Sequence, residues 1–281
     1  MITGIDGIKI LAGVVTYNPS INRFKECIEA IHSQVKNVYI FDNGSENINE
    51  IENLLKKYDD SIILYANKGN SGIATALAEI MEYADRNSYD WVLSMDQDSL
   101  LQDGIIDVYK KSIRRRSDIG MLTCLIKDRN FHDPKYEIQD SDEKDVEYCI
   151  TSGALTSVEA YKKTAGYDKT FFIDCVDFDI CYSLHESGYR VIRVNHVGLL
   201  HEVGRGENRR FLWKKIVVYH EKPNRIYYLA RNTKRLHKKH RSYGITKLIK
   251  KEVALLFRIV LYEDNKKDKI GAFWKGILLD S

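Results

Sequence analysis

The sequence predicts an α/β protein with a mostly parallel, twisted β-sheet flanked by helices and a helical extension at its C-terminal end. Strand-like and helix-like patterns alternate along residues 8–95, which is the arrangement of right-handed βαβ units. The strand-like runs are apolar throughout, as expected for a sheet that helices cover on both faces. A chain of 281 residues, 44% of them hydrophobic, is long enough to bury a sizeable core.

The first half of the chain is a series of strand–helix steps. Runs rich in β-branched and aromatic residues predict strands at residues 8–16, 38–41, 62–65 and 91–95. Apolar side chains at three- and four-residue spacing predict helices at residues 21–35, 48–58 and 73–86, the first with Ser20 as a candidate cap. A polar cluster follows each strand at its carboxyl end, the edge where parallel sheets bind ligands.

The second half is less regular. The pattern predicts a helix at 103–116 and a strand at 119–124, then a polar and acidic loop or hairpin insert over 127–146. Helices are expected near 158–165 and 177–186, and strands at 190–194 and 197–200. Residues 204–208 have loop composition and lead into a basic helical segment.

Charge is distributed unevenly along the chain. Residues 1–204 carry 22 Lys and Arg against 33 Asp and Glu, a net charge of −11, whereas residues 205–281 carry 21 against 7, a net charge of +14. We therefore predict a ligand-binding and catalytic domain over residues 1–204 and a basic, mainly helical extension over residues 205–281. Such an extension indicates contact with phosphate-bearing substrates, a lipid surface or nucleic acid.

Features that report on the cellular compartment predict a cytoplasmic protein. No apolar run approaches the ~20 residues that span a bilayer, and the first residues lack the basic and apolar segments of a signal peptide. The cysteines are odd in number and follow no zinc-binding spacing, so we expect reduced, buried thiols. They are Cys27, Cys124, Cys149, Cys175 and Cys181.

The strongest site signal follows the fourth strand, where Asp96-Gln97-Asp98-Ser99 ends an apolar run. Residues i and i+2 of a strand face the same side, so a turn here lets the carboxylates of Asp96 and Asp98 converge on one cation. Mg²⁺ and Mn²⁺ prefer oxygen ligands, and a bound diphosphate supplies more of them. The alternative is that Asp98 and Ser99 only cap the next helix.

Two further loops are expected at the same edge. Asp42, which precedes Asn43-Gly44-Ser45, could accept an N–H from a pyrimidine base, or could form an Asx turn with glycine at positive φ. The loop Asn67-Lys68-Gly69-Asn70-Ser71-Gly72 precedes a helix, whose N-terminus favours phosphate or ribose oxygens. Its pattern is neither a Walker loop nor a dinucleotide fingerprint.

An acidic cluster and a histidine complete the candidate site. Asp174, Asp177 and Asp179 open a helix, and three acids in six residues exceed what capping requires. A carboxylate is suited to deprotonate an acceptor hydroxyl, and crowded acids raise each other's pKa toward the range of a base. His201 ends an apolar run, which allows either metal or phosphate ligation or a structural role.

In this order, the clusters resemble the family 2 inverting glycosyltransferases of the GT-A fold, and their bacterial rhamnosyltransferase-like branch in detail. The resemblance covers roughly residues 8–235 and implies a Rossmann-like nucleotide-binding half. The matching segments are Val15-Thr16-Tyr17-Asn18, Phe41-Asp42-Asn43-Gly44-Ser45, the Asn67 to Gly72 loop, Asp96-Gln97-Asp98-Ser99, Phe172-Ile173-Asp174-Cys175-Val176-Asp177-Phe178-Asp179-Ile180-Cys181, His201 and Tyr227-Tyr228-Leu229-Ala230-Arg231-Asn232.

The resemblance implies a role for each matched residue. Asp96, Asp98 and His201 would hold Mg²⁺ or Mn²⁺. Asp177 would be the general base, and Asp179 would orient either this base or the acceptor. Because Asp replaces the frequent Glu at 179, the base assignment stays open between the two. The implied donor-binding residues are Thr16, Tyr17, Asn18, Asp42 (on the base), Asn43, Asn67, Gly69, Gly72, Asp96, Gln97 and Arg231 (near the diphosphate or acceptor).

The implied reaction is inverting transfer of a sugar from a nucleotide-diphosphate donor to a hydroxyl of a growing glycan or a lipid-linked saccharide. The branch favours dTDP-rhamnose, with a UDP-hexose as the alternative. A sugar nucleotidyltransferase would need a basic, glycine-rich phosphate loop, which residues 14–20 lack. Clustered carboxylates argue against a nucleic-acid-binding module, so we expect no nucleic acid partner. A carbohydrate-binding protein with an inactive site is a further alternative.

The basic extension contains an apolar helical stripe with cations beside it. It could lie on an anionic membrane as a peripheral contact, or pack against the domain or a second copy in a homodimer. The stripe is Leu248, Ile249, Val253, Leu256, Phe257, Val260 and Leu261, and the cations are Lys247, Lys250, Lys251 and Arg258.

Overall fold

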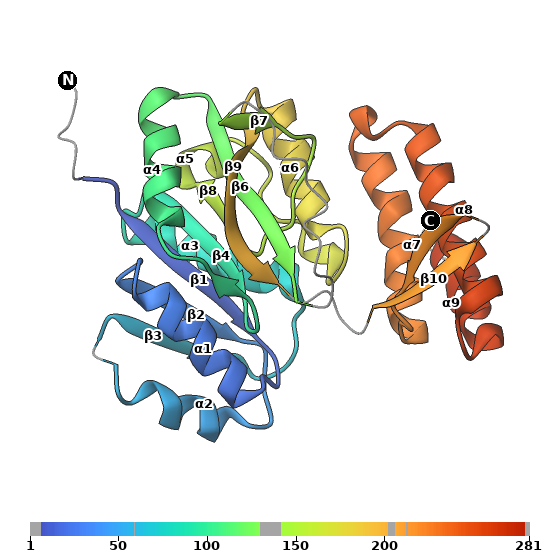
Figure 1. The fold of residues 1–281 in the computed structure, drawn as a ribbon, viewed down its shortest axis with the longest axis horizontal. Coiled ribbons are helices and arrows are strands. Elements are labelled where there is room, and N and C mark those ends of the chain that lie inside the picture. The colour runs from blue at the N-terminus through green and yellow to red at the C-terminus, as the bar shows by residue number, and fades with distance from the viewer. Residues whose placement is uncertain (1–6, 59, 130–141, 202–205, 212, 279–281) are drawn as a thin grey trace.

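The computed structural model describes residues 7–58, 60–129, 142–201, 206–211 and 213–278 (Figure 1). Within these ranges, nine strands form one sheet in the order β3-β2-β1-β4-β8-β6-β9-β5, and β7 pairs with β9. Six strands run in the same direction. They are β1 (Ile10–Thr16), β2 (Asn37–Asp42), β3 (Ile62–Ala66), β4 (Trp91–Asp96), β6 (Ile119–Asp128) and β9 (Arg190–His201).

Helices cover both faces of this sheet, which confirms the predicted fold class (Figure 1). One face packs against α1 (Ile21–His32), α2 (Ile48–Leu55) and α4 (Ile105–Arg115). The other packs against α3 (Ile73–Arg86), α5 (Val158–Lys162) and α6 (Val176–Glu186). Successive side chains of β1 alternate between the two cores, Leu11 in one and Ala12 in the other, because strand side chains point to opposite faces in turn.

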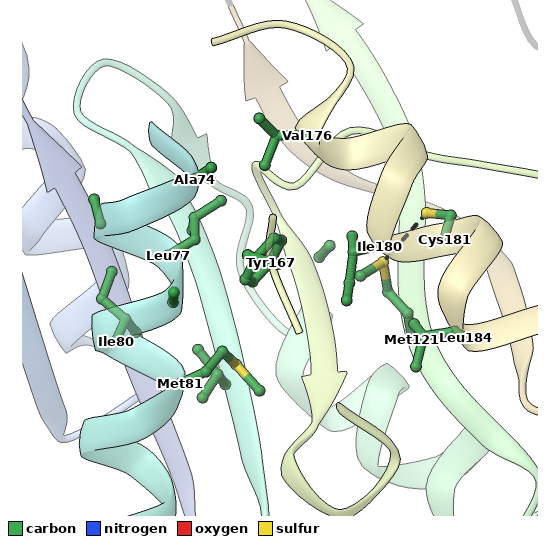
Figure 2. Close-up of a cluster of buried hydrophobic side chains, with 14 of the residues drawn as sticks. Ala74, Leu77, Ile80, Met81, Met121, Tyr167, Val176, Ile180, Cys181 and Leu184 are labelled. Carbon is green, nitrogen blue, oxygen red and sulfur yellow. Dashed lines mark hydrogen bonds between the residues drawn. The ribbon is translucent and has the colours of Figure 1, made fainter. Parts of the chain in front are cut away.

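The core between α3 and α6 positions the candidate site above it (Figure 2). Leu77 and Met81 of α3 face the ring of Tyr167, and beyond the ring lie Ile180 and Leu184 of α6. These side chains are all at most 5% exposed. The apolar contact between the two helices fixes their N-terminal ends, which both lie at the carboxyl edge of the sheet.

Three short strands run antiparallel to their neighbours, and two of them, β5 and β8, were not predicted by the sequence. They are β5 (Leu100–Leu101), β7 (Glu143–Asp145) and β8 (Ala154–Ser157). β8 lies between β4 and β6, and β9 continues without a break through 195–196. The insert predicted at 127–146 contributes the end of β6 and all of β7, while its residues 130–141 lie outside the described ranges.

Two capping expectations need correction. Ser20 stands at the N-cap of α1, but its side chain makes no capping hydrogen bond. Gly104, with φ of +77°, is the N-cap of α4, so Asp98 and Ser99 do not cap that helix. The cysteine prediction is confirmed: all five are free, four are buried and Cys149 is half-buried.

The C-terminal extension packs beside the sheet and contributes no described strand to it (Figure 1). It consists of a hairpin of β10 (Glu207–Phe211) and β11 (Lys214–Val218), followed by α7 (Pro223–Lys239), α8 (Ile245–Tyr262) and α9 (Lys266–Leu278). The hairpin replaces the loop and helix expected there, because residues 216–218 are β-branched and favour a strand. Across the described ranges, no helix combines the length and hydrophobicity needed to cross a bilayer.

Candidate active site

Four predicted site residues lie at the carboxyl ends of strands that run in the same direction. Thr16 ends β1, Asp42 ends β2, Asp96 ends β4 and His201 ends β9. The Thr16 hydroxyl donates a hydrogen bond of 2.9 Å to the Asp42 carboxylate. The parallel sheet therefore gathers these residues at one edge, as the sequence predicted.

Asp42 is buried, with 1% of its surface exposed, and its carboxylate organises the loop after β2. One oxygen accepts hydrogen bonds from the backbone N–H groups of Gly44 (3.0 Å) and Ser45 (2.8 Å), and the other accepts from Thr16 and the Ser45 hydroxyl. Gly44 has a φ of +80°. This geometry is the Asx turn that the sequence offered as one interpretation. The contact of Asp42 with a pyrimidine base stays a prediction.

Two asparagines shape the loop over residues 67–72. Asn43 donates from Nδ2 to the Gly72 carbonyl (3.3 Å) and accepts at Oδ1 from the Ser71 backbone N–H (3.1 Å). Asn67 donates from Nδ2 to the Gly69 carbonyl (2.8 Å). These amides are thus occupied within the loop, while the space in front of Gly69 Cα is open. A ligand can approach the backbone there without meeting a side chain.

The turn after β4 is tied to the end of β1 through Gln97. Its side chain accepts a hydrogen bond from the Tyr17 backbone N–H (2.8 Å) and donates to the Tyr17 carbonyl (3.3 Å). Asn18, with φ of +47°, accepts from the Glu46 N–H (2.8 Å). Gln97 and Asn18 therefore fix the loop after β1 against the turns after β4 and β2. The Tyr17 ring, 48% exposed, can contact a ligand.

Asp96 and His201 face each other at the centre of this edge. Asp96 Oδ2 lies 3.9 Å from His201 Nδ1, and the Ser99 hydroxyl lies 2.8 Å from the same nitrogen. Ser152 donates a hydrogen bond of 3.0 Å to Ser99. When Nδ1–H donates to Ser99, Nε2 of His201 keeps the lone pair that a metal ion requires.

The surroundings of Asp96 fit a divalent cation. Burial raises the pKa of Asp96, Asp98 adds to that effect and His201 opposes it, so a cation here would stabilise the ionised carboxylate. Asp98 does not join Asp96 and His201 in a set of ligand atoms within 4.8 Å of one another in the described ranges. The three-residue metal site therefore stays a prediction, with Asp96 and His201 as the pair that the structure brings together.

A different cluster in the extension does converge within 4.8 Å, namely His220, Glu263 and Asp264. The buried Lys269 ammonium already lies 2.7 Å from Glu263 and also binds Asp264. These carboxylates are therefore neutralised by a lysine, and the cluster is an ion-pair network of the helical extension.

Two adjoining cavities open at the carboxyl edge. The strand-end cavity, of about 490 Å³, is lined by Tyr17, Asn43, Gly72, Asp96, Gln97 and Asp98, among others. The α6 cavity, of about 480 Å³, is lined by Asp174, Asp177, Phe178, Lys251, Glu252 and Arg258, among others. Five residues line both: Ile73, Asp96, Ile173, His201 and Arg225. A ligand in one cavity can therefore touch a ligand in the other.

Asp177 faces the α6 cavity from the first turn of α6. Its carboxylate accepts a hydrogen bond from the Phe178 backbone N–H (3.0 Å). Burial raises its pKa to about 6, against the smaller opposing effects of that hydrogen bond and of Lys251. A carboxylate with this pKa is mostly ionised at neutral pH and is a stronger base than an ordinary aspartate.

The predicted catalytic role of Asp179 is not supported by its position. Asp179 is 1% exposed and does not line the α6 cavity. Its carboxylate instead binds His240 Nε2 at 2.8 Å and Lys239 Nζ at 2.9 Å. The physical reason is helical geometry, since residues two apart on a helix point in directions roughly 200° apart. Asp179 therefore joins α6 to α7.

The turn before α6 adopts unusual backbone conformations. Phe172, Asp174 and Cys175 have φ of +58°, +64° and +63°, values that non-glycine residues rarely adopt. Asn232 of α7, fully buried, donates from Nδ2 to the carbonyls of Phe171 (2.6 Å), Ile173 (2.6 Å) and Asp174 (3.1 Å). This clamp stabilises the strained turn that carries Asp177.

Arg231 orients this clamp and does not line either cavity. It donates from Nε to Asn232 Oδ1 (3.0 Å) and from Nη2 to the Thr170 carbonyl (2.8 Å). The cation that does line both cavities is Arg225, which binds Asp174 at 3.2 Å. The predicted contact of Arg231 with the diphosphate or the acceptor stays a prediction, and Arg225 is an arginine that sequence reasoning did not assign to the site.

Residues of α8 were also missed as site residues. Lys251 and Arg258 appeared in the sequence only as cations beside an apolar stripe, yet both line the α6 cavity. The available signal was their spacing, because residues 251, 255 and 258 fall on one helical face, opposite the exposed Ile249 and Val253.

Comparisons with known proteins identify the family and the fold. The model of glycosyl transferase family 2 matches residues 12–164, which is more than half of the chain. The protein therefore belongs to this family, and the resemblance predicted from the motifs is confirmed.

Individual relatives are more distant. The dTDP-rhamnosyl transferase RfbF of Shigella flexneri is 23% identical over 287 residues, covering 96% of this chain and 93% of that protein. Residues 1–349 of S. aureus TarS in complex with UDP-GlcNAc have a TM-score of 0.61 at 13% identity, covering 96% of this chain and 81% of that one. The Pyrobaculum calidifontis mannosyltransferase PcManGT, in complex with GDP-Man and Mn²⁺, has a TM-score of 0.61 at 13% identity, covering 97% of this chain and 88% of that one. These structures share the GT-A fold.

Proposed function

We propose that the protein is an inverting glycosyltransferase that moves a sugar from a nucleotide-diphosphate donor to the hydroxyl of a glycan or lipid-linked acceptor. The observation that carries this proposal is the placement of Asp177. It faces the α6 cavity, which shares Asp96, His201 and Arg225 with the strand-end cavity. A donor in one cavity and an acceptor in the other would meet at that shared wall.

The chemistry follows from this arrangement. Asp177 takes the proton of the acceptor hydroxyl as the oxygen bonds to the anomeric carbon, and the bond from that carbon to the diphosphate breaks. Attack from the face opposite the diphosphate inverts the configuration. A divalent cation, Mg²⁺ or Mn²⁺, bound near Asp96, Asp98 and His201 would offset the charge that develops on the departing nucleotide.

We infer dTDP-rhamnose as the donor, with a UDP-hexose as the alternative. Support for the first comes from the branch-specific motifs and from the curated name of the Shigella relative. Support for the second comes from the UDP-GlcNAc complex of TarS. The test is a thermal-shift screen of dTDP- and UDP-sugars with each metal, followed by turnover of the sugars that bind. Failure of every nucleotide sugar to bind would contradict the proposal.

The metal requirement is tested by Asp98→Ala and His201→Ala. Losing one ligand should weaken metal-dependent donor binding tenfold or more. Gln102→Ala, on the next loop and outside both cavities, is the control. Unchanged metal dependence in His201→Ala would remove that residue from the ligand set, and the same result in Asp98→Ala would leave Asp96 and His201 as the only protein ligands of the three.

We also propose that the outer face of α8 contacts an anionic membrane. Ile249, Val253 and Val260 are 55%, 60% and 46% exposed on this face, beside the exposed Lys250. Exposed apolar residues with neighbouring lysines suit the surface of anionic lipid. A homodimer through the same face is the alternative.

Co-sedimentation with vesicles of anionic or neutral lipid tests this contact. Ile249→Ser with Val253→Ser should abolish binding to anionic vesicles, whereas Ile63→Ser, an exposed apolar residue on β3, should not. Sedimentation velocity of the same variants tests the homodimer. A wild-type protein that ignores anionic vesicles, or a dimer that the α8 variant dissociates, would contradict the membrane contact.

A further inference from the structure

One face of α8 forms a wall of the α6 cavity. Lys251, Leu255 and Arg258 lie on this face and all line the cavity. The two cations are two helical turns apart, about 10 Å along the axis, with the buried Leu255 between them. The Lys251 ammonium lies 3.8 Å from the centre of the Phe178 ring, next in sequence to Asp177. This cation–π contact directs its charge toward the end of the cavity that holds the base.

In the described part of the chain, these two cations have no carboxylate within the 4.0 Å of an ion pair. Arg225, the third cation of the cavity, binds Asp174 at 3.2 Å and Glu221 at 3.4 Å. Nearby lysines are likewise paired, Lys247 with Glu147 and Lys239 with Asp179. By contrast, Lys251 acts on Asp174, Asp177 and Glu252 only from beyond 4.0 Å, and Arg258 forms no ion pair with a described carboxylate. Partly buried cations of this kind are favoured by a bound anion.

We propose that Lys251 and Arg258 bind an anionic group of the acceptor, a phosphate or a carboxylate close to the hydroxyl that is glycosylated. This inference rests on the proposed function. The donor diphosphate is expected at Asp96 and His201, on the wall that the two cavities share, whereas Lys251 and Arg258 line only the α6 cavity. An anion between these two cations therefore belongs to the second substrate, and the protein selects charged acceptors over neutral ones.

The test measures binding of three small probes to the full-length protein saturated with UDP or dTDP and Mn²⁺, which fills the donor site. The probes are glucose 1-phosphate, glucuronate and methyl glucoside, followed by calorimetry or ligand-observed NMR. At least one anionic probe should bind tenfold or more tightly than the neutral sugar. Preference for the phosphate or for the carboxylate identifies which anion the acceptor carries.

Matched variants locate the effect. Lys251→Gln and Arg258→Gln should each weaken binding of the preferred anion about tenfold and leave the neutral sugar unchanged, whereas Lys250→Gln, on the exposed side of the same helix, should change neither. Rising NaCl should weaken anion binding in the wild type more than in the double variant. Thermal denaturation of each variant establishes that it is folded.

The outcomes separate this inference from the proposed function. A protein that binds the nucleotide with metal but treats the three probes alike, binds none of them, or responds equally to Lys250→Gln would overturn the anion site and leave the glycosyltransferase intact. A protein that binds no nucleotide sugar and transfers none would instead overturn the function itself.

Discussion

Asp177 and Asp179 are neighbours in the sequence but have different surroundings. Both fall in the first turn of α6, and spacing alone assigned either one as the base. Only the packing of α7 distinguishes them, because His240 and Lys239 bind Asp179 on one side while the α6 cavity opens on the other. The same limit applies to Arg225 and Arg231. Local sequence pattern predicts which residue types form a site, but the side on which each lies depends on distant segments.

Replacing Asp177 with Asn should lower turnover about 10²–10⁴-fold and leave donor binding unchanged, because the amide cannot accept the proton. In the wild type, kcat/KM should rise with pH and level off above about 6, as Asp177 ionises. Asp179→Asn should instead lower the melting temperature. Retained turnover in Asp177→Asn would mean that another group is the base.

Glu252 gives a prediction for stability against pH. Its carboxylate oxygens are buried without a described hydrogen-bond partner, and burial, opposed by Lys251, raises its pKa from 4.5 to about 8. Between about pH 4.5 and 8 the unfolded chain has lost this proton while the folded protein still holds it. The free energy of unfolding therefore decreases as pH rises through this range.

Glu252→Gln should therefore stabilise the protein by about 1–2 kcal/mol at pH 8.5, after allowance for solvent screening, and by little at pH 4.5. Urea denaturation at both pH values measures this difference. The exposed Glu52→Gln serves as control and should have no pH-dependent effect. An equal change in the free energy of unfolding for Glu252→Gln at both pH values would show that the effect comes from packing and not from ionisation of Glu252.

At the scale of elements, the alternating strands and helices were predictable because their periodicity is local and repeated. The short strands were not. β5 and β8 have two and four residues and exist because longer neighbours offer them hydrogen bonds. The β10–β11 hairpin was missed although residues 216–218 are β-branched, since the high charge around it favoured a helix. Whether such short segments form strands depends on the strands with which they pair, which can lie far away in the sequence.

The contact of α7 with the turn before α6 can be tested by substituting Asn232. Asn232→Ala removes the amide NH2 group that the carbonyls of Phe171, Ile173 and Asp174 share. Stability should therefore fall by about 2–3 kcal/mol and turnover by tenfold or more. Donor affinity should change little, because the strand-end cavity keeps its walls. Asn232→Asp, which has a similar shape but lacks the N–H groups, should lose stability and turnover as Asn232→Ala does. A variant with normal turnover would show that the turn holds its geometry unaided.

At the scale of the whole molecule, an acidic sheet domain meets a basic extension through ion pairs. Lys239 with Asp179 and Arg225 with Asp174 are examples, and Lys247 with Glu147 is a more exposed one. The charge segregation was evident in the sequence, but it suggested an external anion as the main partner. The structure shows that some of these cations pair with carboxylates of the protein itself, whereas Lys251 and Arg258 have no carboxylate within 4.0 Å in the described ranges.

Screening should weaken the association of the two parts. Raising NaCl from about 0.05 to 0.5 M should lower the melting temperature by a few degrees, because the exposed pairs lose attraction. The exchange Glu147→Lys with Lys247→Glu should restore stability lost in either single variant. A melting temperature that is indifferent to salt would mean that apolar contacts alone hold the extension in place.

The close packing of Gly72 against Phe172 has a consequence for how the two substrates are handled. A methyl group at Gly72 would lie 2.5 Å from the Phe172 carbonyl oxygen, and that same oxygen accepts a hydrogen bond of 2.7 Å from the Ile73 N–H. The loop that ends at Gly72 and the turn before α6 are therefore in direct contact through Phe172. Under the proposed function, a donor that displaces this loop would also displace the turn that leads to Asp177, so donor binding and the position of the base would be coupled through this contact.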